Sequence, residues 1–514
     1  MKSLHIFRYE TIERQAFIAE SLGDPYEQTI HESTHRIHLF ALRSACGSNK
    51  PAADPATDTS VTDTAPHTEA VTEEPTALSA LPTADYSGHI FRVLHENQEN
   101  QQVDIETAGE ENGDILNDLV FRRNSLVEER YNIKIDASNA DGGTVNSTIQ
   151  KQVQAGLTEY DLYFHNCTVI SVATGGYLYN LYDMPNMDMS NPWWDKAALD
   201  GLSVAGMAYM ATGDISPTSL MISSCLTFNK TLFAEYDMEL PYDMVRNGTW
   251  TIDVLAEMTK GLSRDLNGDG QMTYGDDLFA YSAWSYDQPY ALFYGAGGSL
   301  SEKDSNDIPH IAYDFDRITA IYDYMYQIVV ENKAYYVTDS AIYPQTYSCF
   351  TNGGAFFCDA MFFKIDRYFR DMDDEFGILP NPKFDQSQEH YITCVNGAGN
   401  FIVIPNNPAD AARTGMITEA LAAAAYDGIT PSLYDIIIKG RNTRDEDSAE
   451  MVDIIIGNRV FDPHFINTIS GYNFAQNLLA KANKDVVSSL TKTQKNAEKN
   501  MQKIIDAYLE NADS

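Results

Sequence analysis

Apolar and polar residues alternate with two different periodicities along residues 89–166, and together these periodicities predict alternating strands and helices. Three short apolar or alternating runs are typical of strands: "HIFRVLH" (89–95), "NIKIDA" (132–137) and "YDLYFHN" (160–166). Between these runs, apolar residues recur every three or four positions, as they do in amphipathic helices. The order strand, helix, strand, helix, strand predicts an α/β lobe with a largely parallel sheet.

The two predicted helices have defined faces and ends. The second, within residues 144–156, should end at Gly156, because glycine readily adopts the backbone conformation that closes a helix. The first, within residues 113–131, should bury the face formed by Ile115, Leu119, Leu126 and Val127.

A second region with the same mixture of elements begins after "CLTFNKTLFAEY" (225–236). Residues 251–263 have a helical pattern, whereas "GGAFFCDAMF" (353–362) and "FIVIPNN" (401–407) have the pattern of strands. Roughly the last 40 residues are helical in pattern. The chain is therefore expected to contain a second α/β lobe.

Length and charge narrow the expected partners. The chain has 514 residues, of which 44% are hydrophobic, enough for a sizeable core and for more than one domain. Its formal net charge of -39 repels nucleic acid and anionic lipid, so neither is an expected partner. Its cysteines show no metal-binding spacing, and the sequence leaves open whether Cys349 and Cys358 form a disulfide.

The first 85 residues have the features of a signal region followed by a tether. Residues 1–46 form the predicted signal region, and "SACG" (44–47) at its end resembles the end of a bacterial lipobox, although Arg43 and the short apolar run before it depart from that pattern. Residues 47–85 are rich in Thr, Pro, Ala and acidic side chains and cannot bury enough apolar surface to fold. We therefore expect a flexible tether attached to a lipid at Cys46.

The same region contains "HESTH" (residues 31–35), the spacing of a zinc-protease helix. Because it lies upstream of the expected cleavage site, and no third ligand is evident nearby, a protease is not favoured.

Several segments of residues 86–514 together resemble the extracellular solute-binding proteins of bacterial ABC importers, a group that contains many sugar-binding lipoproteins. The segments are "VQAGLTEYDLYF" (153–164), "LTFNKTLFAEY" (226–236), "GTWTIDVLAEMTKGLSRDLNGDG" (248–270), "NGGAFFCDAMF" (352–362), "FGILPNPKFDQSQEHYITCVNGAGNFIVIPNN" (376–407) and "KGRNTRDEDSAEMVDIIIGNRVFD" (439–462).

The resemblance implies a type II-like periplasmic-binding-protein fold, with two α/β lobes joined by hinge strands and a ligand cleft between the lobes. Lobe 1 would comprise residues 86–220 and about 400–455, and lobe 2 about 221–399 and 456–514. The implied protein is a monomer on the extracellular face of a bacterial membrane, bound to the membrane only through its lipid. It would deliver a small solute to ABC permease subunits, without enzymatic activity or an organic cofactor.

The segment "DLNGDGQMTYGD" (265–276) has the spacing of a calcium loop, in which oxygen ligands alternate along the chain and a glycine makes a sharp turn. Gly270 stands at the turn position, and an aspartate ends the loop where EF-hands have a glutamate. The alternative is an Asx-rich turn without an ion. The ligands of a structural Ca²⁺ would be Asp265, Asn267, Asp269, the Gln271 carbonyl, Thr273 and Asp276.

Aromatic and polar residues near predicted strand ends are the candidate ligand contacts, because sugar sites combine ring stacking with polar side chains. In the densest aromatic stretch, "SAWSYDQPYALFY" (282–294), we expect Trp284, Tyr286 and Tyr290 to form a cleft wall. In the resembled family, the ends of two of the predicted strands face the cleft. The further candidates are His165, Asn166, Asp359 and Phe362 at those ends, and Asp214 before the first crossing between lobes.

Three functions remain open at this point. The resemblance favours a binding protein for a saccharide or oligosaccharide. A secreted carbohydrate-active enzyme would need paired carboxylates in a cleft, and the many acidic residues do not exclude such a pair. A surface adhesin or sensor could use the same fold. No Walker A, GxSxG or GxGxxG motif occurs in the chain.

Overall fold

The computed structural model describes residues 76–96, 104–140, 143–441, 443 and 445–512. All of them belong to one compact unit, Glu73–Ser514. The predicted lipid attachment at Cys46, the "HESTH" segment and most of the predicted tether lie outside the described residues. No helix among the described residues is long and apolar enough to cross a membrane.

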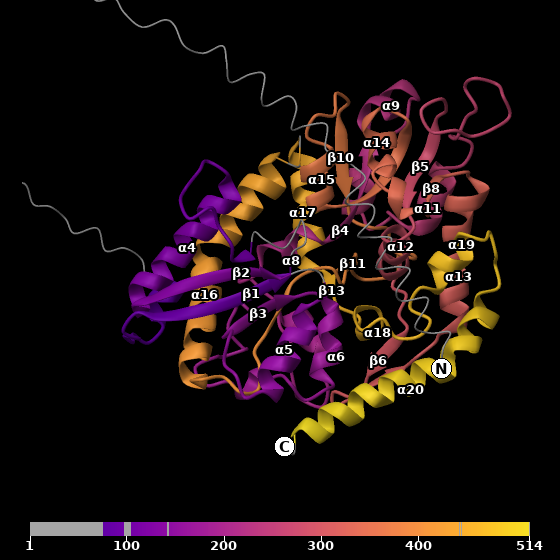
Figure 1. Ribbon diagram of the computed structural model, residues 1–514. Helices are drawn as coiled ribbons and strands as arrows, with labels where there is room; N and C mark the ends of the chain where they lie inside the picture. Colours follow the sequence, from indigo (N-terminus) through magenta and orange to yellow (C-terminus); the bar gives the residue numbers. More distant parts are fainter. Residues whose placement is uncertain (1–75, 97–103, 141–142, 442, 444, 513–514) are drawn as a thin grey trace, which may run out of the picture. The chain divides into compact units, whose positions relative to one another are not determined.

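The first sheet confirms the predicted alternation of strands and helices. Its strand order is β12-β3-β1-β2, in which β1 pairs in parallel with β2 and β3, and β12 pairs antiparallel with β3. Helices α4 and α16 lie side by side next to this sheet (Figure 1). The elements are β1 (His89–Glu96), α4 (Ile115–Tyr131), β2 (Ile133–Ala140), α5 (Val145–Gln154), β3 (Leu162–His165), β12 (Phe401–Val403) and α16 (Ala411–Ser432).

The buried face of α4 differs from the predicted one. Leu126 is 54% exposed, and the side chains that α4 buries are Val120, Arg123, Val127 and Tyr131. The pattern of polar residues predicted the wrong face because it places Arg123 at the surface, whereas the Arg123 side chain is buried and hydrogen-bonded. Its guanidinium donates to the carbonyls of Ile215 and Asp104 at 3.1 and 2.7 Å.

The ends of the first helices follow from local chemistry. The Asp114 carboxylate accepts hydrogen bonds from the backbone N–H groups of Leu116 and Asn117, which caps the N-terminus of α4. Asn132 ends α4 in the left-handed conformation with φ of 49°. Gly156, two residues after α5, has φ of +64°, as expected of a glycine that closes a helix.

The second sheet contains five strands in the order β10-β4-β9-β5-β8. Strand β5 runs parallel to β8 and β9, whereas β4 is antiparallel to β9 and β10. The strand predicted at 353–362 is β9, and the helix predicted at 251–263 contains α11 (Ile252–Met258). The strands are β4 (Ser224–Asn229), β5 (Phe279–Trp284), β8 (Tyr335–Val337), β9 (Ala355–Met361) and β10 (Phe376–Leu379).

Shorter elements surround the two sheets. Two small sheets pair β6 (Ser301–Lys303) with β7 (Pro309–Ile311), and β11 (Thr393–Cys394) with β13 (Arg459–Val460). The other helices are α3 (Ala77–Ala80), α6 (Ile170–Ala173), α7 (Lys196–Leu202), α8 (Pro217–Met221), α9 (Lys230–Glu235), α10 (Tyr242–Arg246), α12 (Gln288–Gly295), α13 (Phe315–Tyr326), α14 (Gln345–Thr351), α15 (Phe362–Tyr368), α17 (Glu446–Gly457), α18 (Pro463–Ile466), α19 (Phe474–Leu479) and α20 (Val486–Ala512). Segments Gln327–Glu331 and Leu433–Arg441 are π-helical, and Cys167–Val169, Leu181–Asp183 and Ser340–Ile342 are 3₁₀-helical.

The folded unit begins earlier than the predicted tether end at residue 85. Leu78 of α3 is buried, and its backbone N–H donates to Asp427 of α16 at 3.3 Å. The Tyr131 hydroxyl donates to the carbonyl of Pro82 at 3.0 Å. These contacts dock residues 76–82 on the first sheet's helices, although their composition is that of the tether.

Segments that pass between the two sheets are connected by buried polar contacts. The Asp104 carboxylate accepts hydrogen bonds from Ser216, Thr218 and Asn400, with the Thr218 and Asn400 side chains both at 2.6 Å. Ser223 forms a bridge with Val395. These contacts join the segment before β4 to the segment between β11 and β12.

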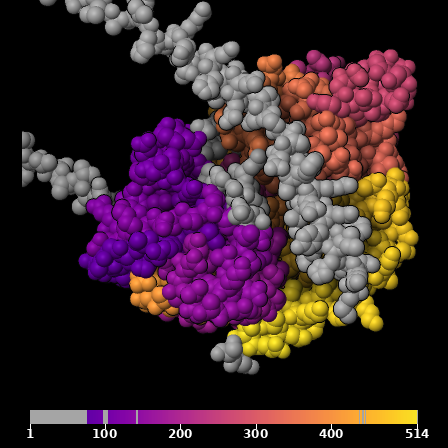
Figure 2. Space-filling view, in the orientation of Figure 1, coloured from indigo at the N-terminus to yellow at the C-terminus, as the bar shows by residue number. Residues whose placement is uncertain are grey.

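The C-terminal part of the chain packs on elements from both halves of the sequence. Helix α17 contacts β10 of the second sheet, so the lobe boundary expected near residue 455 stays a prediction. Helix α20 contacts β7 and α13, and Asn511 donates to the carbonyl of Ala173 at 3.0 Å. Figure 2 shows the surface of α20 meeting the surface of the segments around α6.

Two buried cysteines settle one question that the sequence left open. Cys349 and Cys358 both carry free thiols, as do the other cysteines within the described ranges.

Candidate ligand-binding site

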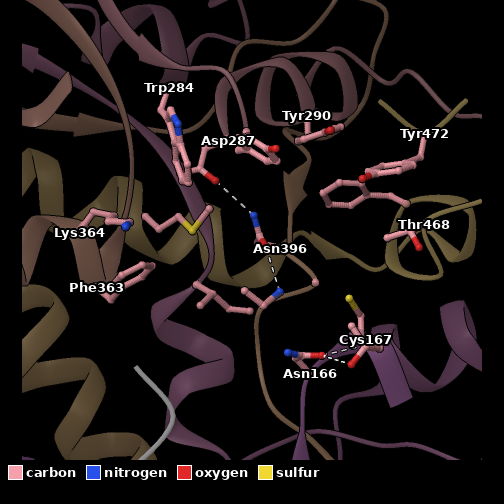
Figure 3. A pocket seen from close by; sticks show the side chains of 17 residues that line it. Asn166, Cys167, Trp284, Asp287, Tyr290, Phe363, Lys364, Asn396, Thr468 and Tyr472 are labelled. Atoms are coloured by element: carbon pink, nitrogen blue, oxygen red, sulfur yellow. Dashed lines mark hydrogen bonds between the residues drawn. The ribbon is translucent and has the colours of Figure 1, made fainter. Parts of the chain in front are cut away.

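A cavity of about 650 Å³ is lined by residues that follow strands of both sheets (Figure 3). The loops after β3, β5 and β9 each contribute side chains, and so do the segment between β11 and β12 and the region of α18 and α19. Ligands of open α/β sheets commonly bind beyond the carboxyl ends of the strands, which is where these loops lie. The lining residues are Asn166, Cys167, Thr168, Ile222, Trp284, Tyr286, Asp287, Tyr290, Met361, Phe363, Lys364, Asn396, Gly397, Ala398, Phe465, Thr468 and Tyr472.

Aromatic rings form two groups in this lining. At one end, the Trp284 ring lies 5.1 Å from that of Tyr286. At the other, the Tyr290 ring lies 4.3 Å from Phe465 and 6.3 Å from Tyr472, nearly parallel to the latter with an angle of 13° between planes. Figure 3 shows Trp284 and Tyr472 on different sides of Asn396. The cavity therefore offers flat apolar faces at two places.

Polar side chains lie between the two aromatic groups. The Asp287 carboxylate accepts hydrogen bonds from the Asn396 amide at 3.3 Å and from the Tyr347 hydroxyl at 3.4 Å. Burial raises the pKa of Asp287 to about 6, although the nearby charge of Lys364 opposes that rise. Because Asp287 follows β5 and Asn396 follows β11, this contact links the second sheet to a crossing segment.

The side of the cavity at β3 is fixed by a second polar network. The Asn166 amide donates to the Glu96 carboxylate at 2.7 Å, and the Asn166 side-chain oxygen accepts from the Thr168 N–H at 2.9 Å. His165 is held by Glu96 and Asn146, each 3.1 Å from one of its ring nitrogens. The hydrogen bonds with Glu96 and Thr168 therefore orient the Asn166 side chain on the cavity wall.

The structure brings together four of the eight predicted ligand contacts, namely Asn166, Trp284, Tyr286 and Tyr290. His165, Asp359 and Phe362 are buried, one or two residues along the chain from positions that do line the cavity. The His165 ring contacts Glu96 and Asn146, Asp359 is buried within β9, and Phe362 is buried at the start of α15. The Asp359 carboxylate accepts from the Trp284 backbone N–H at 3.2 Å, and burial raises the pKa of that carboxyl.

Asp214 lies outside the lining. Its carboxylate accepts a hydrogen bond from the Thr430 hydroxyl of α16 at 2.6 Å, and burial raises the pKa of Asp214 to about 6. Its placement before α8 supports a role in packing α16 rather than a contact with ligand.

An Asp214→Asn variant is expected to change the pH dependence of stability and to leave ligand affinity unchanged. Because the pKa of Asp214 is higher in the folded chain than in the unfolded chain, its stabilising contribution is present in acid and is lost as the pH rises through about 6. The variant should therefore gain about 1 to 3 kcal/mol of stability relative to the natural chain between about pH 4 and about pH 7. Urea unfolding at both pH values measures the difference, with Asp136→Asn at an exposed carboxylate as the control. A constant difference across this range would contradict the assignment.

Sequence reasoning missed Asp287, Asn396 and Lys364 among the polar lining residues. Asp287 lies within the aromatic stretch that was singled out, and its position between Tyr286 and Tyr290 was the available signal. Asn396 and Lys364 carry no distinctive local pattern, and only the folded chain brings them to the cavity. The α18 and α19 region was missed for the same reason.

The predicted calcium loop has an ordered backbone of Asx turns. The Asp265 carboxylate accepts from the N–H groups of Gly268 and Gly270 at 2.6 and 2.7 Å, and Gly270 has φ of +81°. Asp277 rather than Asp276 turns inward, accepting from Leu266 and Thr273 at 2.9 and 2.6 Å. The donor set of exposed oxygens fits the chemistry of Ca²⁺. Among the described residues, however, no three His, Cys, Asp or Glu side chains are grouped as for a metal. Calcium stays a prediction.

Comparisons with known proteins identify the class to which this fold and cavity belong. Residues 109–413 match the profile of the family described as bacterial extracellular solute-binding protein. The match covers more than half of the chain, and the chain belongs to this family. A search of curated proteins found no matching sequence.

Solved structures show the same two-lobed α/β fold. An ABC substrate-binding protein from Listeria monocytogenes, in complex with cycloalternan, is 15% identical with a TM-score of 0.52, and the match covers 81% of this chain and 99% of that one. UspC of M. tuberculosis is 13% identical with a TM-score of 0.52, over 80% and 99% of the two chains. The maltose/maltodextrin-binding domain MalE from Bdellovibrio bacteriovorus, bound to maltotriose, is 13% identical with a TM-score of 0.51, over 80% and 100%. The predicted two-lobed α/β fold class is confirmed, and the hinge and the ligand cleft between the lobes stay predictions.

Proposed function

We propose that this chain captures a saccharide or oligosaccharide in the cavity between its two lobes and delivers it to the permease of an ABC importer. The observation that carries the proposal is the pairing of flat aromatic faces with hydrogen-bonding groups in one cavity. Trp284 and Tyr290 stand at separate places in the lining, with Asp287 and Asn396 between them. A sugar ring has an apolar face that stacks on such rings and a rim of hydroxyls that bonds to such polar groups.

Closure of the lobes is the proposed means of capture. The lining comes from loops of both sheets and from the crossing segments, so a rotation about those segments would change the width of the cavity. The Asp287–Asn396 hydrogen bond joins the second sheet to a crossing segment, so such a rotation would alter this bond. A permease could then distinguish the closed form from the open one.

The structures matched by the fold support the choice of solute. The Listeria monocytogenes protein was solved with cycloalternan, and the Bdellovibrio bacteriovorus domain with maltotriose. At sequence identities of 15% and 13%, the similarity establishes the shared fold and does not establish a shared ligand. The aromatic lining of this chain is therefore the main support for a saccharide ligand.

The proposed location is the extracellular face of a bacterial membrane, with a lipid on Cys46 and residues 47–75 as the tether. The family description supports the extracellular setting, and the sequence of the tether supports the anchor. Mass spectrometry of the protein taken from the membrane fraction tests the anchor through the mass added at Cys46.

The secreted-enzyme alternative has less support from the cavity. Glycoside hydrolysis commonly uses two carboxylates on either side of the scissile bond. Among the described lining residues, Asp287 is the one carboxylate, and it is engaged by Asn396 and Tyr347. An adhesin or sensor role would use the same cavity, and genes for two permease subunits beside this one would favour the importer.

Ligand binding is expected to stabilise the folded chain. A saccharide present at 100 times its dissociation constant should add about 2.7 kcal/mol to the free energy of unfolding, because it binds only the folded state. Thermal unfolding in the presence of neutral and acidic oligosaccharides, peptides and polyamines measures the effect. A shift with peptides or polyamines alone would contradict the choice of solute, and no shift with any of them would contradict the cavity's role in binding.

Calcium is expected to stabilise the chain through residues 265–276. At a calcium concentration 100 times its dissociation constant, the free energy of unfolding should rise by about 2.7 kcal/mol over that in EDTA. Asp269→Ala should remove this gain because it deletes the ligand at the middle of the loop. Asp385→Asn is the matched control, since Asp385 closes a similar Asx turn elsewhere, with Ser387 N–H at 2.8 Å. An equal gain in the Asp269 variant would contradict the site.

A further inference from the structure

One ammonium group in the cavity has no acceptor among the described residues. Lys364, the third residue of α15, lines the cavity and is only 7% exposed. Its nitrogen takes part in no hydrogen bond or ion pair with the described part of the chain. It lies instead against aromatic rings, 4.5 Å from the centroid of Phe363 and 4.6 Å from that of Tyr343. Figure 3 shows the Lys364 ammonium directed toward the space beside Trp284.

Three polar side chains near this lysine are engaged with other partners, and the carboxyl groups of Asp287 and Asp359 lie within electrostatic reach of its charge. The Tyr343 hydroxyl is hydrogen-bonded to that of Tyr368 at 2.9 Å. The Tyr347 hydroxyl donates to Asp287, whose other oxygen accepts from Asn396. The rings stabilise the positive charge through their π faces but offer its N–H groups no lone pair. Because the Lys364 ammonium faces the cavity and forms no hydrogen bond with the described residues, an anionic group that enters the cavity would form charge-assisted hydrogen bonds with it.

We propose that Lys364 makes this cavity select a saccharide that carries a singly charged oxyanion, a carboxylate or a sulfate ester, over its neutral counterpart. The inference rests on the proposed function and names the substrate class of the same cavity. The Trp284 ring centroid lies 5.8 Å from the Lys364 nitrogen. A sugar ring stacked on Trp284 therefore carries its substituents within reach of the ammonium.

The other charged group of the lining limits the charge that the ligand carries. Asp287 faces the same cavity, and its negative charge opposes an anion anywhere except on the Lys364 side. A cavity with one ammonium beside one carboxylate favours a ligand that carries a single negative charge. It disfavours a phosphate monoester, which carries nearly two negative charges. The chain's net charge of -39 adds a long-range repulsion that also grows with ligand charge.

Isothermal titration calorimetry with matched oligosaccharide pairs tests the proposal. The pairs are galacturonate and galactose, glucuronate and glucose, and mannuronate and mannose oligomers of equal length, with sulfated galactose oligomers as a further arm. We expect an acidic member to bind at least 10-fold tighter than its neutral counterpart. Tighter binding of the uronate or of the sulfated oligomer identifies the source of the oxyanion.

Variants at position 364 separate the charge from its surroundings. Lys364→Met keeps the length of the side chain among the rings and should reduce the acidic preference to about one, a loss of about 10-fold or 1.4 kcal/mol. Lys364→Arg should keep the preference, and it tests the proposal independently if the Met variant unfolds. Lys383→Met is the matched control, because Lys383 is also buried, lies 5.2 Å from the ring centroid of Tyr391 and is outside the lining.

The outcomes distinguish the two proposals. If neutral members bind as tightly as acidic ones, or if Lys364→Met keeps the preference, the charge selection is wrong while the saccharide proposal stands. If no saccharide of either kind binds, the proposed function fails, and the selection falls with it.

Discussion

Replacing Trp284 with alanine is expected to weaken saccharide binding by about 10- to 100-fold. The Trp284 ring forms part of the cavity lining, and a sugar face stacked on it would bury several tens of Å² of apolar surface on each partner. At about 25 cal/mol per Å², with the added contribution of ring stacking, the loss is about 1.4 to 2.8 kcal/mol. Calorimetry with the tightest-binding oligosaccharide of the matched panel measures it.

Two further variants show whether the loss belongs to the cavity. Tyr286→Ala removes a ring that is 49% exposed beside Trp284 and should give a smaller loss in the same direction. Tyr182→Ala removes a ring that is 43% exposed outside the lining and should leave affinity unchanged. An unchanged affinity in the Trp284 variant, with its fold intact by circular dichroism, would show that the ligand does not rest on this wall.

Replacing Trp250 with alanine is expected to destabilise the chain by about 3 to 5 kcal/mol, the range for deleting a fully buried large aromatic residue. The Trp250 side chain is 0% exposed, and its indole N–H donates to the carbonyl of Pro380 at 3.0 Å. Its ring stacks on Phe357 of β9 with 6.4 Å between centroids. The variant would leave a large cavity beneath the second sheet and an unpaired carbonyl. Urea unfolding monitored by circular dichroism measures the loss.

Leu240→Ala is the control for this measurement. Leu240 is 42% exposed, and its truncation should change stability by less than about 0.5 kcal/mol. A loss in the Trp250 variant no larger than in the Leu240 variant would contradict the packing described for the second sheet.

The sequence predicted the fold best where local pattern and tertiary packing agree. The runs at 89–95 and 160–166 became neighbouring parallel strands because their apolar side chains fill both faces of a covered sheet. The pattern failed on α4, where Arg123 is buried by partners distant in the sequence. It also failed at residues 76–82, whose docking depends on Tyr131 and Asp427 rather than on their own composition.

The cavity was predictable only in part, for a geometric reason. Aromatic density pointed to Trp284, Tyr286 and Tyr290, which a single loop and the start of α12 bring together. The strand ends indicated the right places, but the Asp359 carboxylate is buried against the Trp284 backbone N–H, whereas Lys364 in the following helix α15 reaches the lining. Asn396 and Phe465 arrive from segments whose approach depends on the crossings between the lobes. No local signal encodes that approach.

The position of β12 has a consequence for the order in which the protein is made. This strand completes the edge of the first sheet by pairing with β3, yet all five strands of the second sheet are synthesised between the two. A nascent chain therefore carries the unpaired β3 edge on the ribosome until residue 403 emerges. Exposed strand edges pair readily with other chains. The first lobe is thus expected to need chaperone protection during translation, and a fragment ending near residue 220 should aggregate when expressed alone.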